Sequence, residues 1–178
     1  MSFSIMTHSE KKLFFLIQSD DRSLFSDIYL NGDFVNRDIE NSKNTSLLGE
    51  AVKRNALKIA NFIIDHEPER MNKPDSSGNL PLSHLPLLDN KEDMIDLFER
   101  KGFDFSKGVG AKGNILHIVA LDAEVGLFKS LVEKGARPTE VNNSKEKPQD
   151  IAKRWGNLVI DSYIEKNHTD NEPSSFDL

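Results

Sequence analysis

The sequence predicts an all-α solenoid of stacked helix-turn-helix units joined by short β-hairpin-like finger loops. One series of positions, each just after an expected helix, has spacings of 35, 35 and 33 residues: Gly32, Glu67, Gly102 and Gly135. A second series, at the openings of four helices, has spacings of 34, 34 and 33 residues: Leu48, Leu82, Leu116 and Gln149. Between these markers apolar residues recur at helical spacing. Periods of this length are typical of repeat architectures.

Each unit is expected to pair a first helix with a second one. The first pair comes from "KLFFLIQSDDRSLFSDIYLNG" at 12–32. The later first helices are expected in "TSLLGEAVKRN", "NLPLSHLPLLDN", "NILHIVALDAE" and "KPQDIAKRWGN", and the second helices in "LKIANFII", "DMIDLF", "VGLFKSLV" and "LVIDSYI". One helix pair cannot bury its apolar face alone, so each unit covers its neighbour.

These segments resemble the ankyrin repeat family, whose unit of about 33 residues opens its first helix with T-P-L-H-x-A. "GDFVN" after Asn31 is similar to the G-A-D-V-N of the family, Leu116-His117 and Pro81-Leu82 fit the helix opening, and "KPQDIAKRWGN" is similar to last repeats. The resemblance implies an N-terminal extension, five repeats and a C-terminal tail, at about 1–6, 7–36, 37–72, 73–106, 107–139, 140–166 and 167–178. Glu67-Pro68 and Ser83 depart from the family pattern, which leaves the geometry of 66–92 open.

Composition excludes several functional classes. A chain of 178 residues with a net charge of -6 and no run of Lys and Arg is not expected to bind nucleic acid or anionic membranes. The absence of cysteine excludes disulfides and thiolate sites and fits a reducing compartment. The apolar run Leu13–Ile17 is too short for a leader or a membrane span. We expect a cytoplasmic monomer without a cofactor.

The stretch "GVGAKG", Gly108 to Gly113, matches the G-x-G-x-x-G pattern of dinucleotide-binding loops. That loop needs a buried strand before the first glycine, and the preceding "ERKGFDFSK" is too short and polar to supply one. A Walker loop is excluded because Gly113 stands where Ser or Thr would hold magnesium. We interpret the stretch as a hairpin tip in which glycine supplies positive φ. Nucleotide binding is the alternative from a different functional class.

The histidines and carboxylates of the sequence do not form a catalytic or metal-binding motif. The ankyrin resemblance gives His117 a structural role at a helix opening, bonded to turn backbone, and His84 falls one place later in its own repeat. Three other histidines follow no metal-ligand spacing: His8, His66 and His168. Glu92-Asp93 is typical of a helix start, where the helix dipole favours negative charge. The chain is therefore not expected to be an enzyme.

The resemblance also implies where a partner binds, because ankyrin partners usually lie against the fingers and the exposed ends of the first helices. The positions carried over are Lys43, Asn44, Lys53, Arg54, Ser76, Ser77, Leu87, Leu88, Lys112, Leu121, Asp122, Lys145, Glu146, Arg154 and Trp155. Trp and Arg are common binding anchors. In the alternative interpretation, Leu87 and Leu121 pack between repeats and Trp155 seals the last one.

The expected function is noncatalytic binding of a protein partner by a bacterial secreted effector or regulatory adaptor in a cytosol. An inhibitor-of-kappa-B-like decoy and an antitoxin or immunity protein are alternatives. The tail "NHTDNEPSSFDL" is expected to be disordered. It is similar to the C-terminal export signals of type IV-secreted effectors and, through Phe176 and Leu178, to a PDZ ligand; an inert end is the third interpretation.

Overall fold

The computed structural model describes residues 6–32, 38–85, 91–110, 113–121 and 124–168. Regular structure in these residues is helical, with one isolated antiparallel β-bridge between Glu40 and Ser46. The chain divides into two compact units, 1–104 with 109–111 and 105–108 with 112–178. No helix within the described ranges is long and apolar enough to cross a bilayer.

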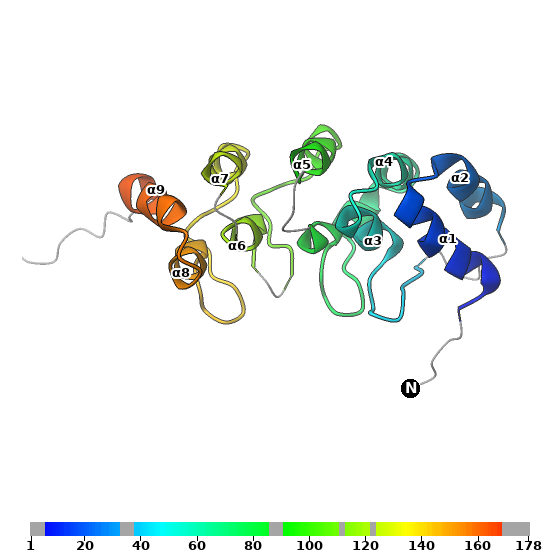
Figure 1. Cartoon of the computed structure of the whole chain (residues 1–178), viewed down its shortest axis with the longest axis horizontal. Helices are drawn as coiled ribbons and strands as arrows, with labels where there is room; N and C mark the ends of the chain where they lie inside the picture. Colours follow the sequence, from blue (N-terminus) through cyan, green and yellow to red (C-terminus); the bar gives the residue numbers. More distant parts are fainter. Residues whose placement is uncertain (1–5, 33–37, 86–90, 111–112, 122–123, 169–178) are drawn as a thin grey trace, which may run out of the picture. The chain divides into compact units, whose positions relative to one another are not determined.

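Unit 1 consists of helix pairs arranged in two layers. First helix α1 packs on α3, which packs on the 3-10 helix η2, while second helix α2 packs on α4, which packs on α5 (Figure 1). The elements in chain order are α1 (His8–Ser19), α2 (Arg22–Asn31), α3 (Leu47–Lys53), α4 (Leu57–His66), η1 (Pro68–Asn72), η2 (Pro81–His84) and α5 (Lys91–Arg100).

Unit 2 repeats this layering with two helix pairs. First helix α6 packs on α8, and second helix α7 packs on α9 (Figure 1). The elements are α6 (Ile115–Val119), α7 (Val125–Glu133), α8 (Pro148–Arg154) and α9 (Leu158–His168). The predicted all-α class is confirmed for the described residues, and the predicted second helices lie at their expected places.

Capping side chains explain where the helices of unit 1 begin. Thr7 accepts the Glu10 amide, and the Glu10 carboxylate accepts the Thr7 amide, which together form a capping box that starts α1. Asp20 ends α1 with a positive φ of 49°. Its carboxylate accepts the amides of Lys58 and Ile59 at the start of α4, at 3.1 and 3.0 Å. Asp20 therefore ties the first helix pair to the second.

The leucines of the second marker series point into the core. Leu48, Leu82 and Leu116 are each at most 1% exposed. In the second-helix layer, the rings of Phe25 and Tyr29 stack at 5.6 Å, and Phe62 meets both edge-on. Such aromatic pairs add specific contacts to the burial of apolar surface. The periodic leucines are thus part of the buried core of the unit to which each belongs.

The first helix expected over 79–90 differs from the prediction. Only the 3-10 helix η2 forms there, and 86–90 lie outside the described residues. Pro81 opens η2, and Leu85, which precedes a proline in the sequence, is extended with ψ 126°. The residue before proline disfavours α-helix, so the proline pair of this segment limits the helix to one turn.

Candidate binding surface

Three finger turns share one side-chain cap. In each turn an Asn or Asp Oδ1 accepts the backbone amides two and four residues further on, an Asx-turn arrangement. The acceptors and their donors are Asn41 with Lys43 (2.9 Å) and Thr45 (3.2 Å), Asp75 with Ser77 (3.0 Å) and Asn79 (2.9 Å), and Asn142 with Ser144 (2.8 Å) and Glu146 (3.0 Å). Three residues after the cap, each turn has a positive φ: Asn44, Gly78 and Lys145. The caps satisfy the turn backbone and leave the side chains between them for other contacts.

The "GVGAKG" stretch uses glycine for close packing. Val109 stands where the other turns have Asn or Asp; it is buried, and its carbonyl accepts the Leu80 amide at 3.2 Å. Gly110 has φ 115°, and a Cβ there would lie 2.7 Å from the Gly78 carbonyl oxygen. Gly113 has φ 93° and lies against the His117 ring. The positive φ expected for these glycines is confirmed, while the tip at 111–112 lies outside the described residues.

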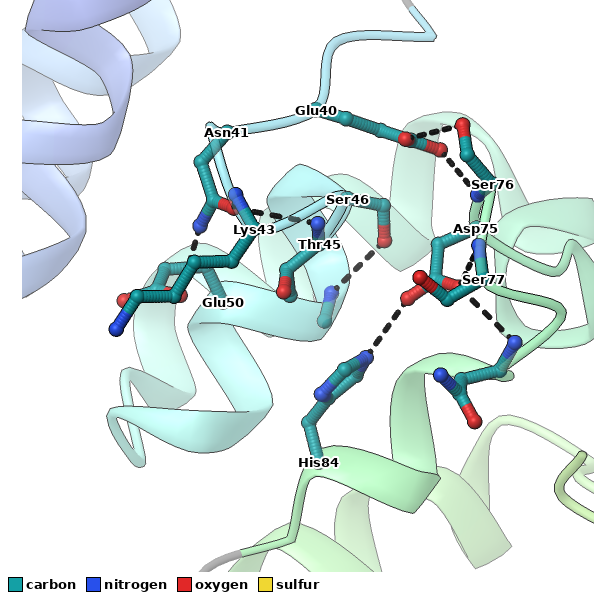
Figure 2. A network of polar contacts seen from close by, with 12 residues as sticks. Glu40, Asn41, Lys43, Thr45, Ser46, Glu50, Asp75, Ser76, Ser77 and His84 are labelled. Carbon is teal, nitrogen blue, oxygen red and sulfur yellow. Dashed lines mark hydrogen bonds and ion pairs between the residues drawn. The ribbon is translucent and has the colours of Figure 1, made fainter. Parts of the chain in front are cut away.

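A polar clamp joins the first two fingers of unit 1. Ser76 donates from its amide and its hydroxyl to the two carboxylate oxygens of Glu40, at 2.8 and 2.5 Å (Figure 2). Just before these residues in the chain, a second pair joins the same two segments: Lys73 Nζ lies 2.5 Å from Asp38 Oδ1. The hydrogen bond from Lys73 lowers the pKa of Asp38 below its ordinary value. Ser76, a predicted partner contact, is therefore already engaged within the molecule.

Arg54 is held at the end of α3 by a buried acid. Glu50 is 6% exposed; it accepts the Asn41 side-chain amide at 3.1 Å and the Arg54 Nε at 2.8 Å. The rest of Arg54 is exposed, with a side-chain exposure of 48%. A guanidinium fixed at one end needs less ordering when it binds a carboxylate.

The two histidines nearest the fingers are structural. His117 Nε2 lies 3.0 Å from the Glu146 carbonyl, and its Nδ1 accepts the Asn114 amide at 3.1 Å. Burial lowers the pKa of His117 below the ordinary imidazole value. His84 Nε2 lies 3.0 Å from Asp75 Oδ2, so it supports the cap of its own finger (Figure 2). The expected role of His117 in binding turn backbone is confirmed.

In unit 2 a charged pair and an indole stand together at the end of α8. Arg154 pairs with Glu146. The pKa of Glu146 is lowered by its hydrogen bond from Asn142, and next by the bond from Arg154. The adjacent Trp155 is 63% exposed. Most of the indole is therefore left uncovered by the described residues.

The predicted partner-binding positions, taken together, fall into three groups: exposed, half-buried and outside the described residues. Most are exposed and lie on fingers or at first-helix ends of their own unit: Lys43, Asn44, Lys53, Arg54, Ser76 and Ser77 in unit 1, and Lys145, Arg154 and Trp155 in unit 2. Leu121 and Glu146 are half-buried. Four lie outside the described residues: Leu87, Leu88, Lys112 and Asp122. The tail that carries Phe176 and Leu178 lies outside them as well.

Two neighbouring exposed apolar residues at the start of α9 were not predicted to be exposed. Leu158 and Val159 were assigned to the apolar stripe of the last helix, yet they are 67% and 58% exposed, while Ile160 and Ile164 are buried. The signal that could have found them is the run of three consecutive apolar residues "LVI", because a helix cannot turn all three to one side.

Comparison with known proteins gives a distant likeness. No family model matches the sequence. Synphilin-1 of Mus musculus is 26% identical over 139 residues, which cover 73% of this chain. The match spans 14% of the length of that protein, so the chain corresponds to a small part of it.

Proposed function

We propose that the chain is a noncatalytic protein-binding module of the ankyrin repeat type. The observation that carries the proposal is the repeated finger turn, which satisfies its backbone through an Asn or Asp cap and leaves its intervening side chains exposed. Layered helix pairs behind the turns and the sequence period of 33 to 35 residues support it. Fold alone does not give function, so the exposed side chains must be tested directly.

The partner surface proposed in each unit consists of its exposed finger and first-helix residues. In unit 1, Lys43 and Arg54 present positive charge beside polar turns. In unit 2, Trp155 offers a large apolar contact next to the Arg154–Glu146 pair. An aromatic anchor surrounded by polar groups is the usual composition of a binding hot spot.

Affinity capture tests this function. The immobilised full chain is compared with Trp155→Ala and Lys43→Glu, and with the control Glu133→Ala on the exposed surface of α7. We expect a captured protein to be lost with Trp155→Ala or Lys43→Glu and retained by the control, after circular dichroism shows equal helix content. Equal capture by all four proteins would contradict the proposed surface.

The captured protein also distinguishes the biological roles. A host protein would support a secreted effector, a transcription factor would support an inhibitor-of-kappa-B-like decoy, and a toxin would support an antitoxin or immunity protein. Each role requires the same kind of binding surface. Action in a cytosol is part of the proposal, since the chain contains no cysteine that an oxidising compartment would pair.

A further inference from the structure

A second surface lies between the second helices of unit 2, away from the fingers. Side chains of α7 and α9 line a groove of about 470 Å³, which we call the α7/α9 groove. This volume falls within the range of pockets that take a small ligand or a few side chains. The lining residues are Val125, Lys129, Leu158, Val159, Ser162, Tyr163, Lys166 and Asn167.

Two contacts relate α9 to α7 and to the helix before it. Asn157, just before α9, donates from its side-chain amide to the Ala120 carbonyl, at the end of α6, at 2.7 Å. One turn into each helix, Lys129 Nζ lies 5.1 Å from the centroid of the Tyr163 ring. These two links, together with the packing of α7 on α9, indicate which residues face one another along the groove.

The groove consequently changes chemistry along its length. Its beginning is apolar, formed by Val125 together with the exposed Leu158 and Val159. Further along, Lys129 from α7 and Lys166 from α9 make it basic, and both lysines are exposed.

No carboxylate belongs to the lining residues. The acidic side chains of α9, Asp161 and Glu165, each lie 3.5 Å from the Nζ of Lys153 on α8, which directs them to the other side of the helix. The positive charge of the groove therefore has no acid of α9 beside it to offset it.

We propose that the α7/α9 groove binds a peptide segment of a partner protein that carries an apolar pair and an acidic pair at separate ends. The apolar pair covers Leu158 and Val159, and the carboxylates meet Lys129 and Lys166. Charge complementarity selects the acidic sequence, while burial of the exposed Leu and Val supplies affinity. The proposal extends the protein-binding function to a surface that shares no residue with the fingers or with Trp155.

The helix geometry sets the spacing of the recognised segment. Val159 and Lys166 are seven residues apart on α9, which is about 10 Å along a helix axis. An extended peptide covers that distance in about three residues. The segment should therefore hold its apolar and acidic pairs about three residues apart, and it can lie in either chain direction.

Fluorescence anisotropy with synthetic peptides and the full chain tests the groove. The probe is a labelled peptide with a Leu-Leu pair, a Gly-Ser spacer of three residues and a Glu-Glu pair. One comparison peptide carries Lys-Lys in place of Glu-Glu, and another has the same composition with Leu and Glu alternating. We expect the acidic probe to bind at least about tenfold more tightly than either comparison peptide, with affinity falling as salt shortens the screening length.

Charge reversal in the groove gives the sharpest readout. The double change Lys129→Glu with Lys166→Glu should reverse the preference, so that the Lys-Lys peptide binds more tightly than the acidic probe. The control is Lys11→Glu with Lys12→Glu, which makes the same change of net charge on the exposed side of α1 and should leave the preference unchanged. All four lysines are exposed, so the unfolding midpoint should remain near that of the wild type.

Several results would overturn the proposal. Equal binding of the acidic and Lys-Lys peptides would remove the charge argument, and loss of binding in the Lys11/Lys12 control would show that binding follows the net charge and not the groove. A retained affinity after Leu158→Ser with Val159→Ser would remove the apolar half. If sedimentation shows a dimer that this last variant abolishes, a second copy of the chain occupies the groove instead. None of these outcomes depends on Trp155, so the finger surface and the groove can fail separately.

Discussion

Replacing Gly110 by Ala should destabilise the protein because two backbones approach closely at this residue. A Cβ on Gly110 would lie 2.7 Å from the Gly78 carbonyl oxygen and 3.0 Å from the Asn79 Cα. These are backbone atoms of the second finger, so no flexible side chain can move aside. The φ of 115° adds a second cost, because residues other than glycine rarely adopt this backbone angle.

The expected magnitude combines these two costs. A residue held in a sparsely populated backbone conformation costs about 1 to 3 kcal/mol. Forcing an extra methyl group into a packed site costs about 1 to 3 kcal/mol as well. The Gly110→Ala variant should therefore lose about 2 to 6 kcal/mol, a large part of the stability of an ordinary domain.

Gly135→Ala is the matched control. Gly135 has a similar φ of 99°, but no atom lies within 4 Å of a Cβ built there. This variant should show the backbone cost alone, about 1 to 3 kcal/mol. Urea unfolding followed by circular dichroism measures both variants. If Gly110→Ala costs no more than Gly135→Ala, Gly110 does not pack against the finger at Gly78 and Asn79 as described, and the packing explanation of "GVGAKG" is wrong.

Three further predictions concern the core, a finger cap and pH. Leu116→Ala should cost about 2 to 5 kcal/mol in urea unfolding, since Leu116 is fully buried, and a negligible loss would mean that the helix-opening series does not face the core. Asp75→Ala should cost at least about 2 kcal/mol by the same assay, because two turn amides and His84 lose their acceptor; an unchanged midpoint would contradict the cap. Burial lowers the pKa of His117, so the folded state takes up a proton less readily than the unfolded chain, whose imidazole has a pKa of about 6.5. The contribution of His117 to the free energy of unfolding should be fully present above that pH and be lost as the pH falls through the folded pKa. The variant His117→Gln should therefore show a flatter dependence of this free energy on pH over that range. Identical pH slopes in the two proteins would refute the prediction.

Periodic features could be predicted from the sequence because each repeat meets the same physical requirement. Leu48, Leu82 and Leu116 are apolar at one spacing because each must fill the space between neighbouring helix pairs. The second helices follow from their apolar stripes, which longer helices display over several turns. The structural role of His117 could be predicted because Leu116-His117 matches the sequence that opens a first helix.

Residues that depart from the repeat pattern explain the structural features that the sequence analysis did not predict. Leu85 precedes Pro86, which disfavours α-helix there, so only the 3-10 turn that Pro81 opens is found where a full first helix was expected. The short 3-10 helix η1 follows α4 because Glu67-Pro68 replaces the helix-ending glycine, and Glu67 accepts the Tyr29 hydroxyl at 2.7 Å. The clamp between Ser76 and Glu40 joins residues 36 positions apart, and no local pattern announces such a contact.

The α7/α9 groove was missed for a related reason. Its apolar beginning looks like core in the sequence, since Leu158 and Val159 adjoin the buried Ile160. Only the packing of α9 on α7 and α8 shows which face of the last helix is covered. The exposure of a stacked helix depends on which neighbours cover it, and the amino-acid pattern of one helix does not contain that information.

Site-specific photo-crosslinking from Trp155 tests protein binding through the exposed first-helix and finger residues most directly. A photoreactive phenylalanine derivative replaces Trp155 in one protein and Glu133, on the exposed surface of α7, in the other. After irradiation in the lysate that yields a captured protein, we predict one dominant adduct from the Trp155 position and none of that mass from the Glu133 position. The same adducts in equal yield from both positions would contradict a dedicated partner surface at the end of α8.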